Sequence, residues 1–138
     1  MKTIFLDTNV LLDFVTGRDG VEEACDILQL GEDSRVKLVT SYLTMANTAY
    51  VARKGRTKED LYEMMIGLSQ MIHVLSMDEA QLKEALTVPV SDLEDMFQYV
   101  CAKTFNCDVI ITRNVKHFVF SQIPVYTPQQ FIELYPTE

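Results

Sequence analysis

The chain has 138 residues, of which 48% are hydrophobic and 23% charged, and its formal net charge is −8 at pH 7. This composition is typical of one globular domain and excludes a disordered chain, and no apolar run approaches the roughly 20 residues of a membrane-spanning helix. We therefore expect a single domain over residues 1–138 and no membrane partner. The negative charge also argues against binding of nucleic acid by electrostatics alone, because phosphate contacts need Lys and Arg.

Residues 1–3 lead directly into an apolar segment, so we find no signal peptide and expect a cytoplasmic protein. The cysteines, Cys25, Cys101 and Cys107, are an odd number without a CxxC pair, and the chain has only two histidines. This inventory disfavours a disulfide framework or a zinc site. It predicts reduced, mostly buried thiols.

Short apolar segments alternate with segments of helical periodicity along the chain. The expected strands are rich in β-branched residues and nearly continuous in apolar character, as in strands covered on both faces; they cover 3–6, 37–40, 71–75, 108–111 and 124–126. A helix is expected after residue 8, and further helices at 21–30, 43–52, 61–68, 80–86 and 93–105. A T-x-x-Q capping box at Thr127 begins the last helix. This alternation predicts βαβ units around a parallel sheet.

Asp7 directly follows the first expected strand and directly precedes a helix. Open α/β sheets bind ligands outside the carboxyl ends of their strands. A carboxylate at this place is suited to hold a hard cation or to act as a nucleophile. The alternative is a purely structural role, since Asp is also a common helix N-cap.

Asp92 and Asp95 lie three residues apart at the start of the long helix near the carboxyl end, so they share one helical face. If this helix begins beside the first strand, both carboxylates converge with Asp7. Three carboxylates suit a divalent cation such as Mg²⁺, which keeps several of its waters. In the structural alternative, Ser91 and Glu94 form a capping box and the two aspartates only complement the helix dipole.

Polar residues follow the fourth expected strand, at the same end of the sheet as Asp7. Arg113 and Lys116 are candidates for phosphate contacts, and Asn114 for a hydrogen bond to a water or a metal ion. Alternatively, Thr112 and Asn114 cap a short turn and the two cations are solvated surface charges.

Four segments in this order, FLDTNVLLDF at 5–14, DLED at 92–95, ITRNVKHF at 111–118 and VYTPQQF at 125–131, resemble the successive motifs of PIN-domain proteins. The resemblance implies a three-layer α/β/α sandwich with a mainly parallel sheet of about five strands. It also implies a Mg²⁺- or Mn²⁺-dependent ribonuclease that cleaves single-stranded RNA, often the toxin of a toxin–antitoxin pair. The implied partners are RNA, a small antitoxin-like protein and a second copy in a homodimer.

By the same resemblance, Asp7 matches the first acidic ligand and Asp95 the acid on the later helix, with Asp92 as an additional acid beside it. Asn9 and Thr112 match polar positions that support the site. The expected roles follow from these matches. The three carboxylates hold the ion that activates a water, and Asp95 accepts the proton of that water.

Two positions depart from the family's pattern. The family usually has a glutamate where this chain has Asn47, and often a fourth acid at the place of Asn114 or His117. An amide still offers an oxygen ligand, but without charge. We therefore keep Asn47 and Asn114 as supporting residues, with three alternatives: a site with one ion, a site that binds metal only with substrate, or an inactive site.

Two other functions remain open from the sequence. The missing acids favour a catalytically degenerate PIN-domain protein that binds RNA or another protein. Helix 61–68 would then bind an antitoxin segment or a second copy of the chain. The alternative is that Met64, Met65 and Leu68 are ordinary core. A phosphotransfer protein with Asp7 as the nucleophile is disfavoured. Asn9 stands where haloacid-dehalogenase-like phosphatases have a second Asp.

Overall fold

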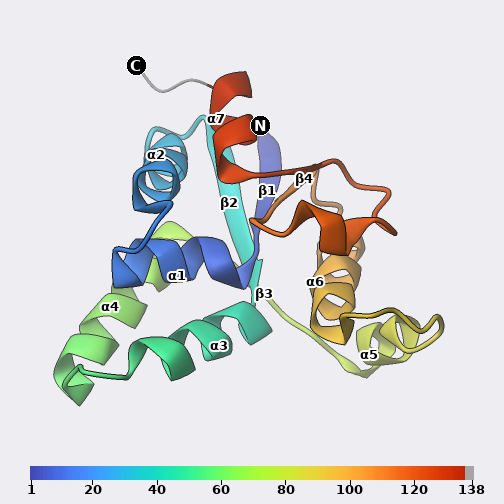
Figure 1. The fold of residues 1–138 in the computed structure, drawn as a ribbon, viewed down its shortest axis with the longest axis horizontal. Coiled ribbons are helices and arrows are strands. Elements are labelled where there is room, and N and C mark those ends of the chain that lie inside the picture. The colour runs from blue at the N-terminus through green and yellow to red at the C-terminus, as the bar shows by residue number, and fades with distance from the viewer. Residues whose placement is uncertain (136–138) are drawn as a thin grey trace.

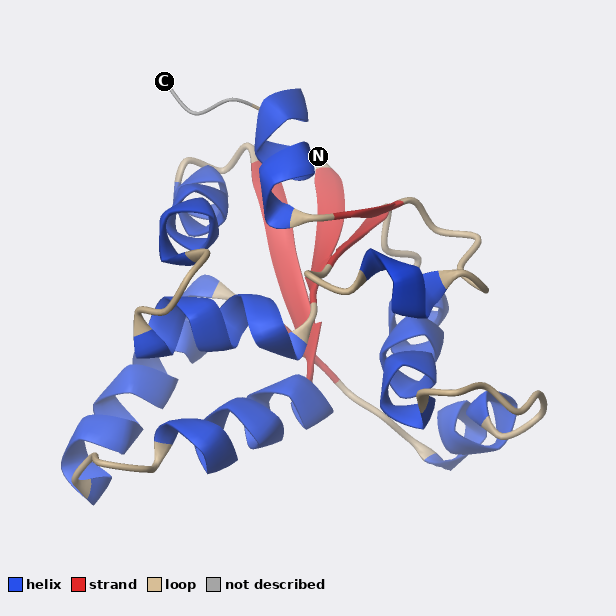
Figure 2. Cartoon of the chain, viewed as in Figure 1, coloured by secondary structure: helices blue, strands red, loops and turns tan. Residues whose placement is uncertain are grey.

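The computed structural model describes residues 1–135 and contains a parallel sheet with helices on both faces (Figures 1 and 2). The strands lie in the order β3-β2-β1-β4-β5. Every neighbouring pair is parallel, so the carboxyl ends of these strands lie together at one end of the sheet. The strand bounds are Lys2–Leu6 (β1), Val36–Ser41 (β2), His73–Leu75 (β3), Val109–Ile111 (β4) and Val125–Tyr126 (β5).

Helices connect the strands, as the periodicity predicts. Within the described residues they are α1 (Thr8–Thr16), α2 (Val21–Glu32), α3 (Tyr42–Ala52), α4 (Lys58–Met71), α5 (Glu79–Ala85), α6 (Leu93–Thr104), a 3₁₀ turn η1 (Val115–Phe118) and α7 (Pro128–Leu134). The predicted capping box at the start of α7 is confirmed. Thr127 accepts a hydrogen bond from the backbone of Gln130, whose side chain accepts one in return.

Strand β1 shows why both faces of the sheet are covered. Ile4 and Leu6 belong to one hydrophobic cluster, with side chains of α1, α2, α3, α4 and α7, whereas Phe5 belongs to the other, with α5, α6 and η1. Burying one large apolar side chain stabilises a fold by about 1.5–3 kcal/mol, so the alternation in β1 favours two helical layers. Figure 1 shows the sheet between them. The predicted three-layer α/β/α sandwich is confirmed.

The boundary between α4 and β3 differs from the prediction. A strand was expected at 71–75, but α4 continues through Met71 and the strand begins at His73. Ile72 separates them with extended dihedral angles (φ −127°, ψ 127°) and is buried. Apolar character at these positions therefore comes from a buried helix end, which periodicity does not distinguish from a longer strand.

Met64, Met65 and Leu68 pack against the core, which confirms the structural alternative for these three side chains, whereas Tyr62 and Ile66 of the same helix are exposed. Leu68 is buried, and Met64 and Met65 are partly buried against the same hydrophobic cluster. The cysteines are free thiols, and Cys101 and Cys107 are buried as expected. Across residues 1–135, every helix is too short or too polar to span a bilayer.

A buried polar network joins three helices at the carboxyl end of the sheet. Gln98 of α6 is completely buried; its amide nitrogen donates to Thr44 Oγ1 at 2.7 Å and to Thr8 Oγ1 at 3.4 Å, and its oxygen accepts from Ser41 Oγ at 2.6 Å. Thr8 also donates to Thr44 at 3.2 Å. These bonds connect α6 to the first turns of α1 and α3, so they hold the helix of Asp92 and Asp95 beside the end of β1.

We expect Gln98→Leu to lower the free energy of unfolding by about 1–3 kcal/mol, because it leaves buried hydroxyls without a partner while nearly conserving volume. Urea unfolding followed by circular dichroism measures the difference. Gln70→Leu, at an exposed position of α4, is the matched control and should change stability by less than about 0.5 kcal/mol. Equal stabilities of the two variants would show that the network does not stabilise the fold.

Candidate metal centre

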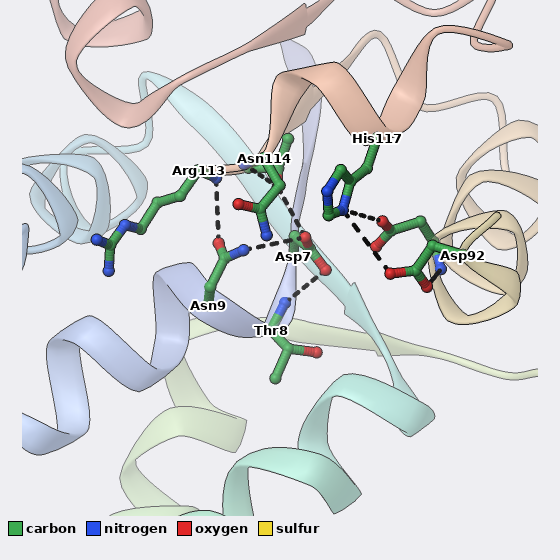
Figure 3. Close-up of polar contacts among 9 residues, drawn as sticks. Asp7, Thr8, Asn9, Asp92, Arg113, Asn114 and His117 are labelled. Atoms are coloured by element: carbon green, nitrogen blue, oxygen red, sulfur yellow. Dashed lines mark hydrogen bonds and ion pairs between the residues drawn. The ribbon is translucent and has the colours of Figure 1, made fainter.

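Asp7 leaves the carboxyl end of β1 and caps α1. Its Oδ1 accepts from the backbone N–H of Thr8 at 2.8 Å, and its Oδ2 accepts from Thr112 Oγ1 at 2.8 Å and from Asn9 Nδ2 at 3.4 Å (Figure 3). The residue is 3% exposed. Burial raises the pKa of Asp7 above its ordinary value of 3.8, although the Thr112 and Thr8 bonds oppose that rise. The Asp7 carboxylate therefore both caps α1 and belongs to the candidate metal site.

Asp92 and Asp95 project from the start of α6, where Asp92 is the N-cap. Its Oδ1 accepts from the backbone N–H of Asp95 at 3.2 Å. The capping box predicted for Ser91 and Glu94 is wrong. The chain enters the helix with extended dihedral angles at Asp92 (φ −126°, ψ 99°), which places this side chain, and not that of Ser91, over the first helical amides.

His117 of η1 completes the cluster. Its Nδ1 lies 3.0 Å from Asp95 Oδ2 and 3.7 Å from Asp92 Oδ2 (Figure 3). One ligand atom each from Asp92, Asp95 and His117 all lie within 4.8 Å of one another. The turn after β4 thus places an imidazole in the segment where the family's pattern often has a fourth acid, at Asn114 or His117.

The carboxylates of this cluster repel one another. Burial, followed by the charges of Asp7 and Asp92, raises the pKa of Asp95 to about 7, and contact with His117 opposes the rise. The pKa of Glu94 is also raised, by partial burial and then by the charges of Asp7 and Asp92. Carboxylate oxygens that lack counter-charge, with one imidazole nitrogen, are a donor set that fits a divalent cation.

Three of the predicted supporting residues lie beside Asp7. Asn9 and Thr112 donate to its Oδ2, and Asn9 Oδ1 accepts from the backbone N–H of Arg113 at 3.2 Å. Asn114 begins η1, and its backbone N–H donates to Thr112 Oγ1 at 3.0 Å. The end of β4 and the start of α1 are therefore joined through polar side chains around this carboxylate.

The other predicted residues lie further from the carboxylates. Asn47 is half-buried on α3, one helical turn after Thr44 of the polar network. Lys116 is exposed on η1. The Arg113 guanidinium pairs with Asp13 of α1, with Nη1 2.7 Å from Oδ1. Phosphate contacts by Arg113 and Lys116 stay predictions.

Sequence reasoning missed His117 as a member of the cluster and Glu94 as an acid whose pKa Asp7 and Asp92 raise. His117 was noted only as an uncharged departure from the family's pattern, and Glu94 only as a capping residue. The available signal was position, because the family often has an acid at the place of Asn114 or His117. Its contact with Asp95 spans 22 residues and depends on the packing of η1 against α6.

Comparison with known proteins agrees with this geometry. The family profile described as PIN domain matches residues 3–116. The chain belongs to the PIN-domain family. Membership favours the PIN-domain interpretation of Asp7 over the phosphotransfer alternative.

Relatives of this PIN domain match over nearly their whole length. It is 26% identical over 142 residues to Ribonuclease VapC1 of Aquifex aeolicus (strain VF5), covering 99% of this chain and 97% of the relative. Among solved structures, it is similar to FitAcB from Neisseria gonorrhoeae (TM-score 0.66, 20% identity, 91% of this chain and 98% of that chain). It is also similar to a toxin–antitoxin complex from Klebsiella pneumoniae (TM-score 0.62, 20% identity, 91% and 97%). At these identities the solved structures establish the fold.

The raised pKa of Asp95 predicts a pH dependence of stability in the metal-free protein. Between the ordinary value of 3.8 and about 7, the folded state holds a proton that the unfolded state has lost. The wild type should therefore lose stability relative to Asp95→Asn as the pH rises from about 4 to about 7, with no further change above. Urea unfolding in EDTA at several pH values measures this difference. If the stability difference between wild type and Asp95→Asn stays constant or reverses with pH, the fold does not raise the pKa of Asp95.

Proposed function

We propose that this PIN domain is a divalent-metal-dependent endoribonuclease that cleaves single-stranded RNA, and that it is the toxin of a toxin–antitoxin pair. The observation that carries the proposal is the cluster of Asp92, Asp95 and His117 at the carboxyl end of the sheet, with Asp7 near enough for its charge to act on Asp95. The relative named Ribonuclease VapC1, which matches along almost the entire chain, supports the activity. The similar toxin–antitoxin complex supports the biological context.

The carboxylates of Asp7, Asp92 and Asp95, with His117, would hold Mg²⁺ or Mn²⁺, because carboxylate-rich sites suit these ions. When bound, the ion supplies a Lewis acid for the scissile phosphate and a lowered pKa for its water. Asp7 is preoriented for this role. Hydrogen bonds from Thr8, Thr112 and Asn9 fix both of its oxygens.

Asp95 is the candidate general base. Its carboxylate lies beside Asp92 at the start of α6, where it can accept the proton of a water activated by the ion. His117 Nδ1 lies 3.0 Å from Asp95 Oδ2, which places the imidazole directly beside this carboxylate.

A catalytically degenerate PIN domain that binds RNA or protein is the second candidate, and the uncharged Asn47 and Asn114 favour it. His117 and Glu94 weigh against it, because His117 adds a ligand-type group to Asp92 and Asp95, and Glu94 adds an acid on which the charges of Asp7 and Asp92 act. We therefore favour the active enzyme.

An antitoxin-like protein and a homodimer remain part of the proposal, as does residence in the cytoplasm. The groove between α3 and α4 supports a protein partner. It has a volume of about 440 Å³ and is lined by Ala49, Leu61, Tyr62, Met65, Ile66 and Ser69, and its Tyr62 and Ile66 are exposed. Exposed apolar side chains that gather in a groove are typical of a site that a partner covers.

Asp7→Asn tests the enzyme. Asn still caps α1, so the fold should remain, but the loss of the charge should lower RNA cleavage by more than the roughly 10–100-fold typical of groups that only orient a metal ligand. The assay is cleavage of a labelled single-stranded RNA in Mn²⁺, Mg²⁺ or EDTA, paired with calorimetric titration of Mn²⁺. Asp78→Asn, at the N-cap of α5, is the matched control and should retain full activity.

Unchanged cleavage by Asp7→Asn, or cleavage that persists in EDTA, would contradict the proposal. Folded wild type that binds RNA without cutting it in either metal would favour the degenerate binding protein.

Asn47→Glu tests how much the missing acid weakens the site. Asn47 follows Thr44 by one turn, and Thr44 contacts Thr8 directly beside Asp7, so an added carboxylate should strengthen Mn²⁺ binding by about tenfold, equivalent to about 1.4 kcal/mol. Calorimetry measures the dissociation constant. Gln70→Glu adds the same charge on α4 and should have no effect. No gain for Asn47→Glu over this control would place residue 47 outside the metal site.

A further inference from the structure

A buried carboxylate holds two arginines beside the metal centre. Asp13 of α1 has a side chain that is 1% exposed, and its Oδ1 lies 2.6 Å from Arg18 Nε and 2.7 Å from Arg113 Nη1. Arg18 follows α1, whereas Arg113 follows β4. The side chains of both arginines are 42% exposed, so part of each guanidinium faces solvent.

The loop that carries Arg18 is shaped closely around Asp13. Gly17 ends α1 in the left-handed conformation (φ 65°), and Gly20 (φ 96°) leaves no room for a side chain, because a Cβ there would lie 2.6 Å from Asp13 Oδ2. That same Oδ2 is buried, and no group within residues 1–135 donates a hydrogen bond to it. An apolar side chain would serve packing at a smaller desolvation cost, so this carboxylate indicates a role in placing the arginines.

Between the two arginines lies an open pocket of about 650 Å³, lined by Asn9, Arg18, Asp19, Arg113 and Asn114. This volume is within the roughly 300–1,000 Å³ of small-ligand sites and suits one nucleotide unit. The pocket adjoins the metal centre through Asn9, whose side chain bonds Asp7 and the backbone of Arg113 and whose carbonyl lies 3.4 Å from Arg18 Nη2. In Figure 3 the Arg113 side chain extends away from Asp7, on the side opposite Asp92 and His117.

The donors of this group suit a phosphate. The two guanidinium groups balance the carboxylates of Asp13 and Asp19, so the pocket is neutral in a chain whose net charge is −8. A guanidinium has five N–H donors in a planar fork that matches phosphate oxygens. Asp13 accepts only one donor from each arginine, at a single oxygen. The exposed parts of both groups therefore remain able to donate to an anion in the pocket.

We propose that Arg18 and Arg113 form a phosphate subsite for the RNA strand, one nucleotide unit away from the phosphate at the metal centre, with Asp13 as the positioning residue. The proposal rests on the proposed ribonuclease function and names the residues that hold the strand. Asn9 separates the subsite from the metal centre, and this places the strand across the start of α1.

The test measures binding and cleavage of one labelled single-stranded RNA by Arg18→Gln, Arg113→Gln and the wild type. Binding is followed by fluorescence anisotropy in EDTA over a range of salt concentrations, so that it is independent of catalysis. We expect each variant to bind about tenfold more weakly and to lower the slope of log affinity against log salt by about 0.7. In Mn²⁺, KM should rise while kcat is largely retained. Lys37→Gln is the control, because Lys37 is exposed near the amino end of β2.

Asp13→Asn tests whether Asp13 positions the two arginines or only contributes its charge. The variant removes a negative charge. If only charge matters, RNA should bind more tightly, whereas loss of the arginine alignment should weaken binding. We expect weaker binding, with a melting curve that confirms folding. Tighter binding would overturn the positioning role of Asp13. Arg18→Gln changes a half-exposed side chain and keeps the subsite testable if Asp13→Asn does not fold.

The outcomes distinguish this proposal from the ribonuclease function. Wild type that cuts RNA, with both arginine variants equal to Lys37→Gln in binding and KM, would overturn the subsite and leave the enzyme. Wild type that neither binds nor cuts RNA would overturn both. Binding that depends on the two arginines, without cleavage in any metal, would support the subsite and overturn the enzyme.

Discussion

The completely buried amide of Gln98 is the constraint on which the rest of the site depends. It bonds Ser41, Thr44 and Thr8, and therefore holds α6 against the first turns of α1 and α3. These bonds span 54 to 90 residues of sequence, so they depend on the tertiary fold that places the three helices side by side. In the buried environment, a hydroxyl or amide without its partner is costly, and this cost disfavours any other placement of α6.

A consequence of that placement is stored electrostatic repulsion. Asp7 and Asp92 each cap a helix, which stabilises the fold locally, yet the charges of both disfavour the ionised form of Asp95. Burial, followed by this repulsion, raises the pKa of Asp95 to about 7, so the folded protein keeps a proton there up to a much higher pH than an isolated Asp does. Groups that conflict locally while the surrounding packing is well formed are a common mark of a functional site.

Opposite charges lie on the two sides of Asn9. The carboxylates and His117 gather on one side, and Arg18 and Arg113 on the other, held by buried Asp13. An acidic protein can bind an RNA strand if a cation offsets the carboxylates and a few arginines are fixed where the phosphates run. The net charge of −8 therefore does not by itself decide against a nucleic-acid substrate, because the local distribution of charge determines the contacts.

The sequence by itself determined the alternation of strands and helices, the parallel sheet and the position of Asp7 at a strand end, because these depend on periodicity and on capping within a few residues. It also identified Asp92 and Asp95 as neighbouring acids at the start of one helix, although the structure makes Asp92 the N-cap and not a residue of a shared helical face. Only the tertiary structure decided that His117 contacts Asp95 and that Asp13 holds Arg18 and Arg113 together. The bond between Arg113 and Asp13 spans 100 residues, and no local pattern encodes it. Local sequence thus determines where the helices and strands form. The register of β1 against β4 and the packing of α6 determine which side chains come into contact.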